Sequence, residues 1–122
     1  MHLSGVRRQL DEAKQALVES AGLAADGKYD PAYRVALRSR NLLFHATRGL
    51  AAARGEPLPE MPVVGRAGGG IADHAPALAA IDQALATEDD LTMPTHLALA
   101  HDPYALYLGF LRTEVGRTLQ KG

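Results

Sequence analysis

The chain has 122 residues, of which 47% are hydrophobic and 22% charged. This length is typical of one domain, and the composition is that of an ordinary soluble globular protein. The sequence has no cysteine, which excludes disulfides, thiolate metal ligands and a cysteine nucleophile. We see neither a secretory signal nor an apolar run of membrane-spanning length. We therefore expect a single cytoplasmic domain, residues 1–122, with no membrane contact.

The net charge of −1 combines a basic region with an acidic one. Residues 26–55 carry six basic side chains and two acidic ones, a net charge of +4. Residues 56–102 carry one arginine and eight acidic side chains, a net charge of −7. Either the two regions neutralise each other across the fold, or the basic region forms a face that binds a phosphate-bearing ligand.

Apolar residues at helical spacing predict a first helix over residues 4–25 and a second over residues 31–55. For the second helix, Asp30 is expected to cap the N-terminus, Pro31 to occupy the first position and Gly55 to lie just past the end. The connection between the two helices is short, which predicts an antiparallel pair.

Residues 56–72 contain three prolines and four glycines, which predicts a loop. Its glycines at 68–70 lie close to Arg66, as in a phosphate cradle. However, the loop lacks the Lys-Ser/Thr pair of a P-loop, and no strand is predicted before it. A flexible surface loop is the interpretation that we favour.

Two further helices are predicted after this loop. One covers residues 76–87, and the last begins at Pro103, capped by Asp102, and runs to about residue 120, with a short helical segment at 94–101 before it. No alternating strand pattern is present. The fold predicted is therefore all-α, an up-and-down four-helix bundle with a Gly/Pro-rich loop between its second and third helices.

The second helix carries a polar stripe where a buried helix would be apolar. Its members are spaced 4, 3, 4 and 3 residues apart, so they share one face: Arg34, Arg38, Asn41, His45 and Arg48. Two other faces are apolar, so we expect the helix to lie between partners, either within the bundle or across a dimer interface. The stripe either binds an anion or is a solvated or interface face, paired with acids of the third helix.

Arg40 is followed by four residues and then His45, within the stretch RSRNLLFHATRGLAAARG. This arginine-to-histidine spacing resembles the motif of the HEPN superfamily, small helical bundles that include toxin-type ribonucleases and nucleotide-binding proteins. The stretch also resembles the long second helix of small members, over about 25 residues. The resemblance implies an RNA- or nucleotide-binding module, a homodimer, and a toxin–antitoxin or defence setting with an antitoxin-like protein partner.

For an active member, the resemblance implies a metal-independent endoribonuclease that needs no cofactor. Arg40 and His45 would be catalytic, with His45 as general acid or base. The ligand-binding residues would be Arg34, Arg38, Asn41 and Arg48. An ideal helix, however, places Arg40 and His45 about 140° apart. The alternative is a non-catalytic structural or protein-interaction bundle that dimerises through its second helix, with His45 held within the bundle.

We expect no metal site. His96 and His101 are five residues apart, whereas two ligands on one helix need a spacing of three or four. His101 and Asp102 could instead approach His74 and Asp73 in space, which the sequence leaves open.

Overall fold

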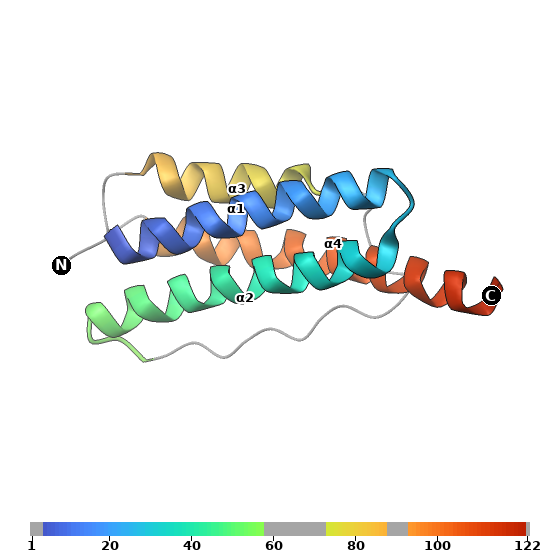
Figure 1. Cartoon of the computed structure of the whole chain (residues 1–122). Coiled ribbons are helices and arrows are strands. Elements are labelled where there is room, and N and C mark those ends of the chain that lie inside the picture. The colour runs from blue at the N-terminus through green and yellow to red at the C-terminus, as the bar shows by residue number, and fades with distance from the viewer. Residues whose placement is uncertain (1–3, 58–72, 88–92, 122) are drawn as a thin grey trace.

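The computed structural model describes residues 4–57, 73–87 and 93–121 of the chain. Four helices account for nearly all of them: α1 (Ser4–Ala25), α2 (Tyr29–Ala53), α3 (Ala75–Ala86) and α4 (Met93–Lys121). The described residues include no strand. The predicted all-α four-helix bundle is thereby confirmed (Figure 1).

Each helix packs against two others. α1 packs against α2 and α3, and α4 packs against the same two helices from the other side. Neighbours run antiparallel; for example, Arg7 near the start of α1 reaches Leu85 near the end of α3. α2 and α3 lie across the diagonal and run in the same direction, so the end of α2 and the start of α3 are at opposite ends of the bundle (Figure 1).

Leucine and alanine dominate the core, as a sequence without tryptophan requires. Along α1, Leu10, Ala13 and Leu17 are fully buried and face this core. Along α4 burial fades towards the C-terminus: Leu111 is fully buried, whereas Leu119 is 76% exposed. The reason is visible in Figure 1, where the last turns of α4 extend past the turn between α1 and α2.

The ends of α2 differ in part from the sequence prediction. The helix begins at Tyr29, so Asp30 lies inside the first turn, and the capping position falls to Lys28, whose side chain makes no capping bond. Asp30 instead pairs with Arg34 one turn later. At the other end Gly55 has φ +69, the left-handed conformation typical of a residue just past a helix.

The break predicted before Pro103 is absent. α4 is continuous from Met93 to Lys121 with Pro103 inside it, and Asp102 is therefore not a cap. A proline removes one hydrogen bond, to the carbonyl four residues earlier. That carbonyl belongs to Leu99, a residue that is 64% exposed. Met93 and Leu97 before the proline bury against the same core as Tyr104 and Leu108 after it, and this packing outweighs the lost bond.

Two buried serines join α1, α2 and α4. Ser39 donates to the Ala13 carbonyl at 2.6 Å, and Ser20 donates to the Ala32 carbonyl at 2.7 Å. Because each serine proton is used in this way, the tyrosine hydroxyl beside it must be the donor. Tyr104 bonds Ser39 at 2.6 Å, and Tyr107 bonds Ser20 at 3.0 Å. All the polar groups of these two clusters are thus satisfied inside the core.

The two serine bonds are symmetric about the turn between α1 and α2. Ser20 and Ala32 are 12 residues apart, and Ala13 and Ser39 are 26 apart, so both pairs are centred on Asp26. Each serine bonds the other helix of the hairpin, once in each direction. Small side chains along this contact, such as Ala13 and Ala36, allow the two backbones to approach closely.

Candidate nucleic-acid interface

The polar stripe of α2 lies on the solvent-exposed side of the bundle. All five members, Arg34, Arg38, Asn41, His45 and Arg48, are exposed. They lie on the side of the helix opposite the buried Leu43 and Leu50. The apolar faces of α2 are covered by α1 and α4 of the same chain. The apolar faces thus have partners without a second copy, and the homodimer stays a prediction.

Three of these arginines lie near acidic or aromatic side chains. Arg34 pairs with Asp30 at 3.1 Å, and both side chains are largely exposed. Arg38 borders a shallow hollow that Glu12 and Glu19 of α1 also line. The guanidinium of Arg48 lies 5.8 Å from the centre of the Phe44 ring, a cation–π arrangement. Asp82, the acid described on α3, instead pairs with Lys14 of α1 at 2.7 Å.

Arg40 and His45 lie on different sides of α2. His45 is exposed, whereas Arg40 is half-buried and its charge acts on His101 of α4. The Arg40 Nε atom is buried and has no hydrogen-bond partner within the described part of the chain. Arg40 is thus close enough to His101 for its charge to lower the pKa of His101. His45 lies on another side of α2, as the 140° separation on an ideal helix predicts.

His101 is a functional candidate that sequence reasoning did not assign to the site, because the fold alone sets its neighbours on α2. Its ring meets Phe44 edge-on with 6.1 Å between ring centres. Burial lowers the pKa of His101, the Asp102 carboxylate opposes that effect, and Arg40 adds to it. A largely neutral imidazole beside an arginine is able to accept a proton or a hydrogen bond. Only the packing of α4 on α2 reveals this pair, which lies 61 residues apart in sequence.

Among the described residues no three His, Asp or Glu side chains are grouped as a metal ion would need. His74 lies 3.8 Å from Asp73, away from His101. Arg66 and the glycines at 68–70 fall outside the described residues. No helix in the described ranges combines the length and apolar character needed to span a membrane.

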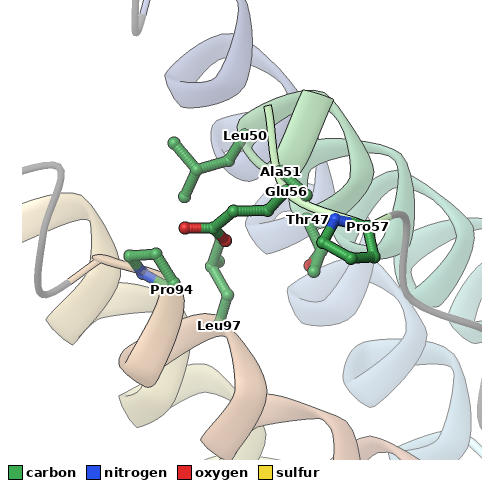
Figure 2. Close-up of a pocket in the computed structure, with 7 residues that line it drawn as sticks. All are labelled: Thr47, Leu50, Ala51, Glu56, Pro57, Pro94 and Leu97. Carbon is green, nitrogen blue, oxygen red and sulfur yellow. The ribbon is translucent and has the colours of Figure 1, made fainter. Parts of the chain in front are cut away.

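A small hollow lies where the end of α2 meets the start of α4. It has a volume of about 160 Å³ and is lined by Thr47, Leu50, Ala51, Glu56, Pro57, Pro94 and Leu97. Figure 2 shows the Glu56 carboxylate extending between the two helices, towards Leu97 and Pro94. Arg54 pairs with this carboxylate at 2.9 Å. With one acid among apolar neighbours, the hollow does not continue the basic face of α2.

Comparison with protein-family models, with curated proteins and with solved structures gave no match for this chain. The class that the fold and the site define is therefore a four-helix bundle with an exposed basic face on its second helix.

Proposed function

We propose that this protein is a HEPN-like helical module that binds single-stranded RNA, or a nucleotide, on the exposed face of α2. The observation that carries the proposal is the line of three arginines, one asparagine and one histidine, all exposed on one rigid helix. From Arg34 to Arg48 this line is about 21 Å long. Arginine forks match phosphate oxygens, and exposed bases can hydrogen-bond to the asparagine and histidine.

The surroundings of these arginines favour an exchangeable contact. The Arg34–Asp30 pair is exposed, and exposed ion pairs contribute only about 0–1 kcal/mol. A phosphate can therefore replace or join Asp30 at little cost. Arg48 keeps its position by stacking on Phe44, which leaves its N–H groups available to a ligand.

The proposal contains no cleavage step, because Arg40 and His45 lie on different sides of α2. Incubating the protein with RNA in EDTA, beside the His45→Ala variant, tests this directly. Cleavage that is lost in the variant would add a nuclease activity to the binding function. The toxin–antitoxin setting and the antitoxin-like partner rest on the HEPN resemblance alone.

Fluorescence anisotropy with a labelled single-stranded RNA is the primary experiment. The test variant is Arg38→Gln with Arg48→Gln, and the matched control is Arg8→Gln with Arg117→Gln, two exposed arginines of α1 and α4. Both variants remove two positive charges. The test variant should bind at least tenfold more weakly, and the slope of log affinity against log salt should fall by about 1.4, or 0.7 per lost phosphate contact.

An equal loss in the two variants would overturn the proposal, since it would show attraction by overall charge alone. No RNA binding by the folded wild-type protein would also overturn it. In that case, self-association measured by sedimentation, lost in the Arg38→Gln, Arg48→Gln variant, would favour the protein-interaction alternative.

A further inference from the structure

Two hollows share Tyr29 in their lining, near the turn between α1 and α2. The first has a volume of about 300 Å³ and is lined by Ala21, Ala24, Ala25, Tyr29, His74, Tyr107 and Phe110. The second has a volume of about 310 Å³ and is lined by Tyr29, Asp30, Arg34, Val115, Thr118 and Leu119. One is aromatic, and the other contains the first arginine of the α2 stripe.

The lining of the first hollow has the chemistry that a planar ring requires. It combines three alanines of α1 with four aromatic side chains. Tyr29 meets Phe110 edge-on at 6.2 Å, and His74 lies at 6.2 Å from the Tyr107 ring, tilted by 53°. The hydroxyl of Tyr107 is bonded to Ser20, so that ring is held in place. A volume at the lower end of ligand pockets suits one ring system.

The second hollow supplies the charge. Arg34 is 77% exposed at its side chain and contacts Asp30 through one guanidinium nitrogen, Nη2. Its other N–H groups can bind a phosphate. Asp30 holds the guanidinium at the wall of the hollow but also repels an anion there.

We propose that the two hollows together form a groove that binds one nucleotide, with the base in the aromatic hollow and the adjoining phosphate at Arg34. Tyr29 lies between the two parts. The choice of ligand rests on the proposed function. An RNA strand held along Arg38 and Arg48 would place one of its bases in the aromatic hollow. Aromatic rings bind bases by stacking, with little preference for sequence.

The test uses adenosine monophosphate (AMP) and adenosine as probes, with ¹⁹F NMR of protein labelled with 3-fluorotyrosine. The four tyrosines give four signals, which single Tyr→Phe variants assign. AMP should shift the signals of Tyr29 and Tyr107. The signals of Tyr33 and Tyr104, which do not line the hollow, should stay within a small fraction of those shifts.

Two kinds of variant separate the base site from the phosphate site. Ala24→Leu fills the aromatic hollow and should weaken both probes at least tenfold, with Ala52→Leu on the exposed side of α2 as control. If Ala24→Leu fails to fold, Ala25→Leu replaces it, because Ala25 is exposed. Arg34→Gln should weaken AMP about tenfold and leave adenosine unchanged.

Failure of this inference is distinguishable from failure of the proposed function. RNA binding that depends on Arg38 and Arg48, with no AMP-induced shift of Tyr29 and Tyr107, would overturn the nucleotide groove alone. AMP affinity that is unchanged in both Ala24→Leu and Ala25→Leu would also overturn the nucleotide groove. AMP binding that depends on Ala24 and Arg34, without RNA binding along α2, would support the groove and overturn the RNA proposal.

Discussion

The hydroxyl oxygens of Ser39 and Tyr104 lie 2.6 Å apart in the centre of the bundle, on α2 and α4. Ser39 donates a hydrogen bond from its own hydroxyl to the Ala13 carbonyl of α1, so this one serine connects three helices. Burial raises the pKa of Tyr104 far above its usual range, and the Ser39 bond only partly offsets that effect. The hydroxyl of Tyr104 therefore stays protonated, as a donor must.

Replacing Ser39 with alanine should destabilise the protein more than replacing Tyr104 with phenylalanine. Ser39→Ala leaves the buried Tyr104 hydroxyl without its partner, which costs about 1–3 kcal/mol. Tyr104→Phe removes the hydroxyl itself, and Ser39 keeps its hydrogen bond to the Ala13 carbonyl. We therefore expect a loss of about 1 kcal/mol in the free energy of unfolding. Urea unfolding followed by circular dichroism measures both, since the chain has no tryptophan.

The double variant Ser39→Ala, Tyr104→Phe completes the cycle. Its destabilisation should fall below the sum of the two single changes, because no lone hydroxyl remains. Strict additivity would show that the two hydroxyls do not interact, contrary to the distance between them.

Arg7 should contribute to stability, whereas its neighbour Arg8 should not. Arg7 is half-buried and donates to the carbonyls of Leu85, at 2.7 Å, and Thr87, which end α3. Arg7→Met should cost about 1.5 kcal/mol, the usual contribution of hydrogen bonds to a charged group. Arg8 is exposed, so Arg8→Met, with the same charge change, should stay within about 0.5 kcal/mol. Thermal or urea unfolding compares the two variants. Equal destabilisation would show that the hydrogen bonds from Arg7 to the end of α3 do not stabilise the protein.

Stability should fall on acidification, and His101 should cause part of that fall. Burial lowers its pKa below 6.5 in the folded state, so the folded protein holds fewer protons than the unfolded chain between the two pKa values. The free energy of unfolding therefore falls as the pH drops below 6.5, until folded His101 is protonated as well. Unfolding curves from pH 8 to pH 5 follow this change.

His101→Gln should flatten that part of the pH profile. In Arg40→Gln the pKa of His101, followed by NMR, should rise because a neighbouring positive charge is gone. A pKa that does not respond would mean that Arg40 and His101 do not interact.

Asp30→Asn should strengthen the binding of RNA and AMP. The change frees Arg34 and removes a negative charge from the hollow that both residues line. We expect a gain of about threefold in affinity at low salt that shrinks as salt rises. Glu114→Gln, which breaks the Arg117 pair on α4 with the same charge change, is the control. A loss of affinity in Asp30→Asn would show that Asp30 binds the ligand.

Periodicity predicted the helices well, because burial of apolar stripes decides where they form. Its errors lie where local chemistry and packing compete. Asp30 and Pro31 suit a helix start, yet α2 begins at Tyr29, whose ring packs against Phe110. Pro103 suits a helix start as well, yet burial on both sides of it keeps α4 continuous.

For the site, the sequence predicted that the polar stripe of α2 shares one face, but it did not predict which residues of other helices lie near α2. The spacing of Arg34 to Arg48 within one helix is a local property, and the structure has all of them exposed. The proximity of Arg40 to His101 and the groove at Tyr29 depend on how α4 lies against α2, and no spacing along the chain encodes that alignment.

Two hydrogen bonds centred on a single turn make the α1–α2 hairpin intolerant of length changes there. An extra residue between Ala25 and Tyr29 would move Ser20 away from Ala32 and Ser39 away from Ala13 at the same time. Since helical side chains rotate by about 100° per residue, the hairpin could restore neither bond by sliding. Substitutions at Asp26 and Lys28, which are exposed, should thus be accepted far more readily than insertions, whereas Gly27 has φ +75 and favours glycine.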